Sequence, residues 1–200
     1  MIVSIHQPEH FPYMGYFQKM EAVDLFIILD DVKFRKNYFQ NRNRFLNTSG
    51  DEEWFTVPVQ KKCISKNINE VLVSPDHRWR KKLIKQLEMN FKKDLSDVYV
   101  GDSLLDINMN SIKYARHQLG IETPMVLSSE LDVGGRQSEK LSNLCRAVGA
   151  TTYVSGPFGK DYLDTSLFQE EDIKIDFFEP KVNNYYSILY NLYTKENMND

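Results

Sequence analysis

The sequence predicts an α/β protein, with a mostly parallel sheet, helices on both of its faces and a small appended lobe. Three observations lead to this fold class. Short apolar runs alternate with amphipathic stretches of helical period, which is the order of strands joined by crossover helices. One run, residues 25–29, is apolar throughout, as expected for a strand buried on both faces. The composition, 42% hydrophobic and 26% charged, is typical of a globular chain.

The first thirty residues predict a compact strand–helix–strand unit. Residues 2–5 form its first strand, residues 16–22 its helix and residues 25–29 a second strand parallel to the first. Such crossovers are right-handed in nearly all cases. The polar turn that follows the first strand then lies at the carboxyl edge of the sheet, where open α/β sheets bind their ligands.

The middle of the chain is less regular. Residues 33–47 are basic and aromatic and are expected to form a loop. The elements expected after it are a strand at 54–59, another at 68–73, a helix beginning near 75 and a helix at 106–119. Pro58 argues for an edge position of the first of these strands, because proline has no N–H to donate.

The last part of the chain returns to alternating strands and helices. The expected elements are strands at 125–127, 152–154 and 173–177 and a helix at 138–148. Residues 1–180 are predicted to form one domain. Residues 181–200 are predicted to be a Tyr- and Asn-rich tail with frayed final residues. Its tyrosines could pack on a second copy in a homodimer.

Charge and cysteine content narrow the functional classes. The net charge of −3 gives no general attraction to nucleic acid. Cys63 and Cys145 lie far apart in unlike contexts, which is typical of a reducing compartment and not of a disulfide framework. No stretch approaches the roughly 20 apolar residues of a membrane helix, and no signal-peptide run precedes the first turn. We therefore expect a cytoplasmic protein without a membrane span.

The turn after the first strand concentrates groups that bind ligands or transfer protons. His6 and His10 can serve as general acid or base near neutral pH, or donate to phosphate or carboxylate. We assign them the catalytic roles together with Asp31, and which histidine is the base stays open. The substrate contacts expected in the same turn are Gln7, Tyr13, Gly15 and Tyr16. A metal on these groups is less favoured, because their spacing matches no zinc motif.

Two other segments offer substrate contacts. Arginine forks pair with phosphate or carboxylate, and the contacts expected in the basic segment are Lys33, Lys36, Asn41, Arg42 and Arg44. Glycines after a strand let backbone amides approach a ligand, and those expected there are Ser155, Gly156, Gly159 and Tyr162. The alternatives are a solvated loop and an ordinary strand-to-helix turn. Single-stranded nucleic acid is disfavoured by the acidic net charge and by the lack of a second basic-aromatic patch.

Short motifs follow one another in a distinctive order along the chain. They are His6-Gln7-Pro8, Pro12-Tyr13, Gly15-Tyr16, Asp30 to Phe34, Asn41-Arg42, Trp54, Val57-Pro58-Val59, Ser155-Gly156, Gly159 and Tyr162-Leu163. In this order they resemble the WbqC-like family over residues 1 to about 180. Its members are encoded with bacterial surface-polysaccharide genes, and some carry the label of glycine transferase in O-antigen assembly.

The resemblance implies a Rossmann-like (HUP-like) fold and a cytoplasmic transferase of lipopolysaccharide biosynthesis. Such an enzyme would move an acyl or aminoacyl group, such as glycyl, onto a nucleotide-linked amino sugar. A more distant likeness, to nucleotidyltransferases and pantothenate synthetases, makes ATP with magnesium a candidate cofactor. Here His-x-x-x-His around a proline replaces the His-x-Gly-His of that group. The alternatives are a protein that binds a nucleotide or nucleotide sugar without catalysis, and an ATP-using adenylate-forming enzyme.

Overall fold

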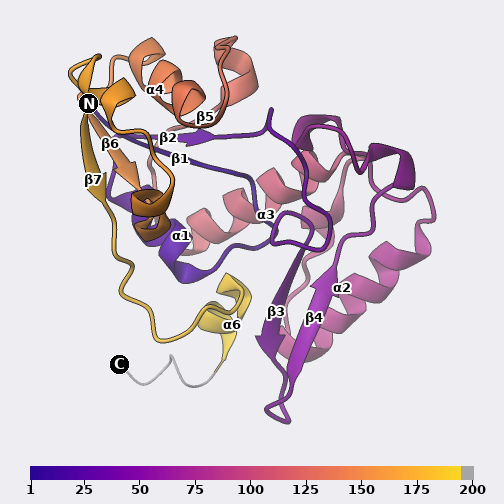
Figure 1. Cartoon of the computed structure of the whole chain (residues 1–200). Helices are drawn as coiled ribbons and strands as arrows, with labels where there is room; N and C mark the ends of the chain where they lie inside the picture. The colour runs from indigo at the N-terminus through magenta and orange to yellow at the C-terminus, as the bar shows by residue number, and fades with distance from the viewer. Residues whose placement is uncertain (195–200) are drawn as a thin grey trace. The chain divides into compact units, whose positions relative to one another are not determined.

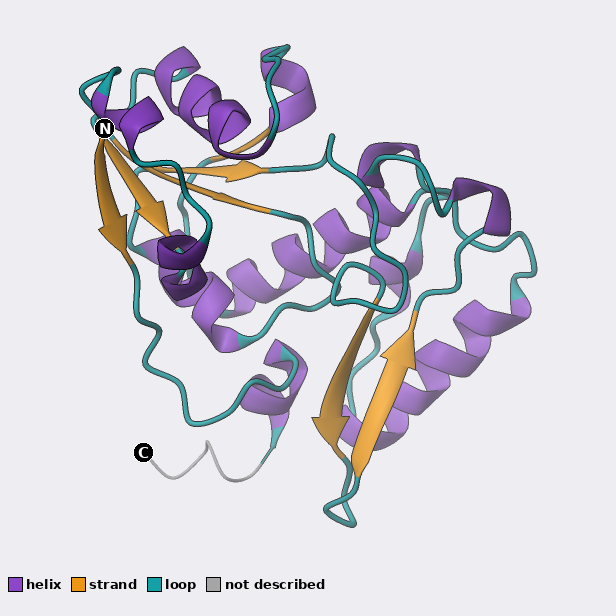
Figure 2. Cartoon of the chain, viewed as in Figure 1, coloured by secondary structure: helices purple, strands orange, loops and turns teal. Residues whose placement is uncertain are grey.

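The computed structural model describes residues 1–194, which form two compact units (Figures 1 and 2). Unit 1 comprises residues 1–7, 15–30 and 121–181. Unit 2 comprises residues 8–14, 31–120 and the chain from residue 182 onward. The predicted tail is described as far as Thr194, and the fraying expected of its final residues lies outside the described part.

Unit 1 is built on a five-stranded, all-parallel sheet in the order β5-β2-β1-β6-β7. The strands are β1 (Ile2–His6), β2 (Leu25–Ile28), β5 (Met125–Leu127), β6 (Thr152–Ser155) and β7 (Lys174–Phe177). The chain winds from β1 outward through β2 to β5, then returns to place β6 on the other side of β1. The direction of winding therefore reverses between β1 and β6, and open α/β sheets bind their ligands at the carboxyl ends of the strands at such a reversal.

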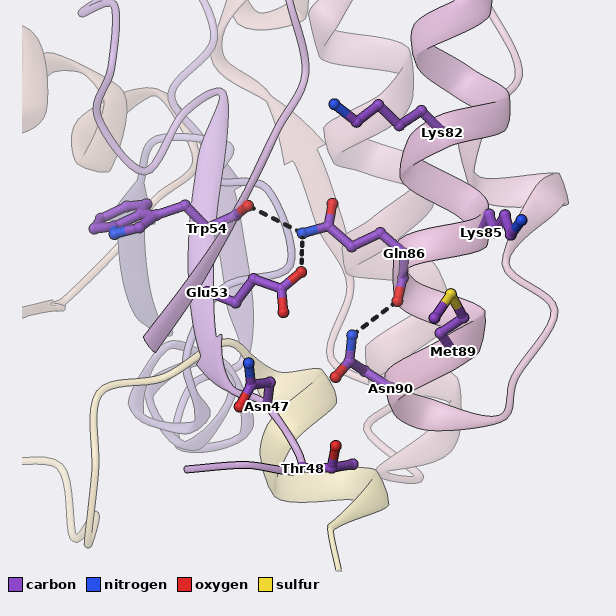
Figure 3. Close-up of a pocket in the computed structure, with 9 residues that line it drawn as sticks. All are labelled: Asn47, Thr48, Glu53, Trp54, Lys82, Lys85, Gln86, Met89 and Asn90. Atoms are coloured by element: carbon purple, nitrogen blue, oxygen red, sulfur yellow. Dashed lines mark hydrogen bonds between the residues drawn. The ribbon is translucent and has the colours of Figure 1, made fainter. Parts of the chain in front are cut away.

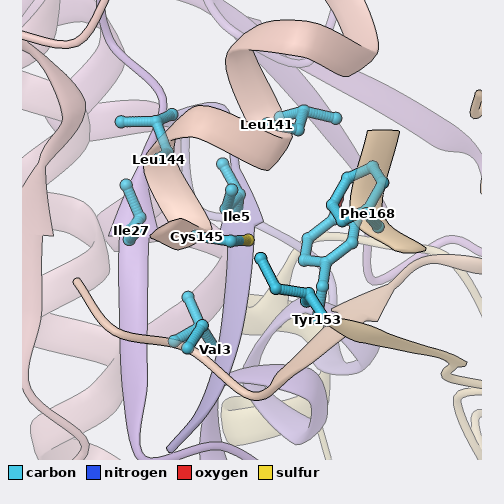
Figure 4. Close-up of a cluster of buried hydrophobic side chains, with 10 residues drawn as sticks. Val3, Ile5, Ile27, Leu141, Leu144, Cys145, Tyr153 and Phe168 are labelled. Carbon is cyan, nitrogen blue, oxygen red and sulfur yellow. The ribbon is translucent and has the colours of Figure 1, made fainter. Parts of the chain in front are cut away.

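Helices cover both faces of this sheet, as Figure 1 shows for α1 (Met14–Glu21) and α4 (Gln137–Ala147). Alternate residues of β1 face opposite sides. One side joins the apolar core under α4 and the short α5 (Ser166–Gln169), drawn in Figure 4. This core comprises Val3, Ile5, Ile27, Leu141, Leu144, Cys145, Ala150, Tyr153, Phe168 and Ile173. On the other side α1 packs against β2, with the Tyr16 and Phe26 ring centroids 5.1 Å apart. The predicted α/β class is confirmed.

Unit 2 contains a two-stranded antiparallel sheet and three helices. These are β3 (Arg42–Leu46), β4 (Glu52–Thr56), α2 (Arg78–Phe91), α3 (Leu104–Gln118) and α6 (Ile188–Tyr193). The inner face of the hairpin buries Asn43, Phe45 and Phe55. The Phe45 ring lies 4.8 Å from that of Phe91 at the end of α2, measured between centroids. Three 3-10 turns lie at Lys61–Cys63, Ile68–Glu70 and Ser96–Tyr99.

Two segments differ from the sequence-based expectation. The loop expected at 33–47 contains β3, whose inward positions include a polar residue, Asn43, and so lack an apolar alternation. The strand expected at 68–73 is a 3-10 turn over Ile68–Glu70, where the Glu70 carboxylate accepts the backbone N–H of Asn67. Beyond that turn only single bridges form, at residues 72 and 73. The strand expected at 54–59 spans Glu52–Thr56 and ends before Pro58.

Candidate functional site

His6 ends β1 at the carboxyl edge of the unit 1 sheet. Its half-buried ring meets the Tyr16 ring of α1 edge-on, with centroids 4.7 Å apart. Nδ1 lies 3.2 Å from the carbonyl oxygen of Gln7. Because a carbonyl can only accept, we assign the imidazole proton to Nδ1, which leaves a lone pair on Nε2.

Lys19 of α1 supplies positive charge to the surroundings of His6. Loss of contact with water and then the charge of Lys19 lower the pKa of His6 to about 3. His6 is therefore neutral throughout the physiological range of pH. Lys19 is itself buried, with Nζ 5.9 Å from the centroid of the Phe26 ring. Lys19 is not among the site residues predicted from the sequence, although it lies three residues after Tyr16 and so on the buried side of a short helix.

Ser155 ends β6, the strand next to β1. Its Oγ is shielded from water and makes no hydrogen bond of normal geometry within residues 1–194. The Tyr162 hydroxyl is near enough for Ser155 to offset part of the burial that raises the pKa of Tyr162. The 3-10 turn Pro157–Asp161 then folds back so closely that a Cβ at Gly159 would collide with Ser155 Oγ.

Two aromatic rings stand exposed at this turn. Phe158 is 77% exposed and Tyr162 is 63% exposed. Both rings follow β6, the strand next to β1 in the sheet. The turn after β6 therefore offers apolar faces beside a buried hydroxyl.

Asp30, at the end of β2, has a structural role. Its carboxylate accepts hydrogen bonds from Ser128 Oγ (3.0 Å), Ser129 N (3.0 Å) and Ser129 Oγ (2.6 Å). These bonds join the ends of β2 and β5 and leave the carboxylate fully buried. The next residue, Asp31, which was assigned a catalytic role, belongs to unit 2.

His10 lies in the core of unit 2. The Phe11, Phe55 and Tyr99 rings surround it at centroid distances of 5.3, 5.3 and 5.6 Å, and Nε2 lies 3.1 Å from the Tyr99 hydroxyl. The ring has no exposed surface, and burial lowers the pKa of His10 to about 3. This enclosure favours a packing role, so a catalytic role of His10 stays a prediction.

Buried polar side chains hold the segment that contains His10. Asn43 Nδ2 donates to the Phe11 carbonyl at 2.8 Å, and Asn108 Nδ2 donates to the Pro8 carbonyl at 3.0 Å. The Phe11 N–H donates to Ser111 Oγ at 3.0 Å. Phe11 has a φ of +43°, which a bulky residue adopts only where its surroundings impose it. The turn is therefore a rigid part of unit 2.

Three of the substrate contacts predicted in the basic segment, Lys33, Lys36 and Asn41, lie in unit 2 and differ in burial. Asn41 is buried, donating to the Val57 carbonyl at 3.0 Å and accepting the Asn37 N–H at 2.9 Å. Lys33 Nζ donates to the Ser65 carbonyl at 2.8 Å, whereas Lys36 is exposed. Asn41 therefore supports the fold rather than facing a ligand.

Comparison with known proteins places the chain in a family. The model of the WbqC-like protein family matches residues 7–196. The chain belongs to the WbqC-like family. It is 33% identical over 190 residues to the uncharacterized protein Rv1507c of Mycobacterium tuberculosis (strain ATCC 25618 / H37Rv), with 88% of this chain and 81% of that protein covered. No solved structure matches the chain.

The residues predicted for the site in this WbqC-like chain divide between the two units. Unit 1 contains His6, Gln7, Gly15, Tyr16, Ser155, Gly156, Gly159 and Tyr162. Unit 2 contains His10, Tyr13, Asp31, Lys33, Lys36, Asn41, Arg42 and Arg44. Within unit 1, β1 and β6 bring His6 and Ser155 to the same edge of the sheet. Tyr13 pairs with Tyr185 at a centroid distance of 5.5 Å, and burial, Glu9 and Tyr185 raise the pKa of Tyr13 to about 12.

A groove of about 660 Å³ lies elsewhere in unit 2, along α2 and the β3–β4 hairpin (Figure 3). Its two walls are joined by hydrogen bonds, since Gln86 Nε2 of α2 donates to Glu53 Oε1 at 2.6 Å and to the Trp54 carbonyl at 3.2 Å. It contains none of the predicted site residues. Among residues 1–194, no helix is long and apolar enough to span a membrane, and no three His, Cys, Asp or Glu side chains are placed to hold a metal ion.

Proposed function

We propose that this WbqC-like chain is a transferase of bacterial cell-surface polysaccharide biosynthesis. It binds a nucleotide-linked amino sugar at the carboxyl edge of the unit 1 sheet and transfers an acyl or aminoacyl group, such as glycyl, onto it. The observation that carries the proposal is the reversal of winding between β1 and β6, with His6 and Ser155 at the two strand ends. Crevices at such reversals bind nucleotides in many α/β proteins.

Charge at this edge suits a nucleotide diphosphate. Lys19 contributes positive charge near His6, and the turn that begins at Gly156 follows β6 directly. His6 is neutral and therefore adds no charge of its own. The phosphates are then held by the charge of Lys19, while the imidazole is left for the chemical step.

The proposed step assigns His6 a proton-relay role. The amino group of the sugar attacks the carbonyl carbon of the acyl donor, forming an amide bond, and the donor's leaving group departs with the electron pair of the broken bond. Nε2 accepts the proton that the amine loses and passes it to the leaving group. Because the pKa of His6 is lowered to about 3, the imidazole does not hold that proton at rest, and transfer must accompany bond breaking.

Ligand-induced stabilisation tests the binding part of the proposal. The chain is mixed with UDP- and dTDP-linked amino sugars, with glycine, and with ATP and magnesium, and the melting temperature is recorded. A ligand that binds only the folded state raises that temperature. We expect a rise with a nucleotide sugar that is reduced in Lys19→Gln, which removes the positive charge near His6, and retained in His117→Ala, an exposed histidine in the last turn of α3. A well-folded chain that responds to no nucleotide contradicts the proposal.

Product analysis tests the catalytic part. The stabilising sugar is incubated with glycine plus ATP and magnesium, with glycyl-tRNA and with acyl thioesters, and mass spectrometry is used to look for the acylated sugar. Its formation, lost in His6→Ala, supports transfer. Binding without product from any donor favours the alternative of a nucleotide-sugar-binding protein. A melting response to ATP and magnesium alone favours the adenylate-forming alternative.

A further inference from the structure

The outer face of the β3–β4 hairpin of unit 2 combines two arginines with a tryptophan. In the antiparallel register Arg44 lies opposite Trp54, and Arg42 lies opposite Thr56. Because side chains alternate between the faces of a strand, Arg42, Arg44, Glu52 and Trp54 share the outer face. Figure 3 shows the Trp54 indole pointing away from Gln86, so its ring is turned from the groove along α2. The indole is 37% exposed.

Hydrogen bonds fix the orientation of this indole. Trp54 Nε1 donates to Glu52 Oε1 at 3.0 Å. The other oxygen of the same carboxylate, Oε2, lies 2.9 Å from the NH1 nitrogen of Arg44. Glu52 is thereby held from two sides, and its charge neutralises that of Arg44. The result is a flat, partly exposed ring whose position is set before any ligand arrives.

Arg42 differs from Arg44 in having no carboxylate partner within residues 1–194. Its guanidinium carbon lies 4.2 Å from the centroid of the Trp54 ring, which orients the planar fork by a cation–π contact. The Nε atoms of Arg42 and Arg44 are both shielded from water and have no acceptor in the described part of the chain, so the two arginines differ in the carboxylate that Arg44 alone contacts. Arg42 is therefore an oriented guanidinium without an anion.

We infer that this face is a binding site for an acidic sugar, a pyranose ring that carries a carboxylate or a phosphate. The Arg42 fork accepts such an anion in bidentate geometry. The exposed part of the Trp54 ring packs against the C–H groups of the sugar, and Tyr186, whose centroid lies 5.9 Å from the Arg44 guanidinium carbon, adds an aromatic wall. A nucleic acid strand needs several unpaired cations in a row, and among residues 1–194 this face presents one, Arg42. The site lies within unit 2 and does not depend on the proposed transferase function.

Tryptophan fluorescence reports directly on this site. The chain has two tryptophans, and Trp79→Phe leaves Trp54 as the single reporter. Glucuronate, glucose 6-phosphate and glucose are titrated separately. We expect one or both of the charged sugars to change the Trp54 emission saturably and glucose to be much weaker. Preference between the two charged sugars identifies carboxylate or phosphate as the anion. An equal response to glucose and to the charged sugars, or none in the folded chain, overturns the inference.

The affinities of arginine variants for the charged sugar show whether the planar guanidinium of Arg42 binds the anion or whether positive charge alone is enough. Arg42→Gln is expected to weaken binding of the charged sugar by about tenfold or more, the loss typical of a charge-assisted hydrogen-bond pair. Arg42→Lys keeps the charge but not the planar fork, and is expected to fall between Arg42→Gln and the unchanged chain. Arg44→Lys is the matched control, because a lysine can retain the pairing with Glu52. Equal losses in the Arg42 and Arg44 variants overturn the inference. Calorimetric titration of the unmodified chain and of the arginine variants gives the same comparison if Trp79→Phe does not fold.

Discussion

At the scale of single residues, the two histidines of the first turn illustrate how burial changes what an imidazole does. His10 is enclosed by aromatic rings and has a pKa lowered to about 3, whereas an unfolded chain gives it the ordinary value near 6.5. Between these two values the unfolded state binds a proton that the folded state does not. Above pH 6.5 His10 adds no pH dependence, and from pH 6.5 down to about pH 3 it makes folding progressively less favourable.

This predicts that His10 alone lowers the free energy of unfolding by about 2 kcal/mol between pH 7.5 and pH 5. Urea unfolding at the two pH values, for the unmodified chain and for His10→Phe, measures the difference. His6 contributes equally to the pH dependence of the free energy of unfolding in both proteins, so it does not account for a difference between them. Identical pH dependence of the two proteins would show that His10 is not buried as a neutral group.

At the scale of an element, the turn after β6 depends on glycine at one position and not at another. A Cβ at Gly159 would collide with Ser155 Oγ, whereas Gly156 has a φ of −69° and no atom within 4 Å of where a Cβ would stand. Gly159→Ala is expected to reduce the free energy of unfolding by about 1–3 kcal/mol, the usual cost of overpacking. Gly156→Ala is the control and should change it by less than about 1 kcal/mol.

The clash at Gly159 can also be relieved by removing the Ser155 hydroxyl. In the double variant Ser155→Ala/Gly159→Ala the hydroxyl is gone, and part of the lost stability should return, because the Leu163 side chain still lies close to the new Cβ. Denaturant unfolding of the two single variants and the double variant gives the coupling free energy. A double variant that is simply the sum of the two single ones would mean that the two side chains do not meet.

Elements also differ in how far they could be predicted. The strands of the parallel sheet were predicted within a residue or two of their bounds, most simply β2, which is an apolar run. From this the shared carboxyl edge of His6 and Ser155 followed, because parallel strands end on the same side. β3 was missed because its buried positions include Asn43, whose role depends on residues about thirty positions earlier in the chain. Lys19 was missed because its proximity to His6 depends on how α1 packs.

At the scale of the whole molecule, neither unit is a continuous stretch of chain. The turn that contains His10 and the segment after residue 181 both belong to unit 2. Nothing in local periodicity reveals such an arrangement. It rests on contacts far apart in sequence, such as the hydrogen bond from the Ser187 N–H to the Arg44 carbonyl at 2.9 Å. The residues after 181 are therefore expected to stabilise unit 2.

Truncation after Lys181 tests this expectation. It removes α6, whose Ile188 and Leu189 are fully buried, and the Tyr193 hydroxyl that lies 2.6 Å from that of Tyr114. Each buried aliphatic side chain contributes about 1.5–3 kcal/mol, so the loss should exceed about 3 kcal/mol and show as a lower melting temperature and faster proteolysis. Phe158→Ala is the control, because that ring is 77% exposed and its removal should leave the melting temperature nearly unchanged. A truncated chain as stable as the full one would show instead that residues 182 onward form a dispensable tail.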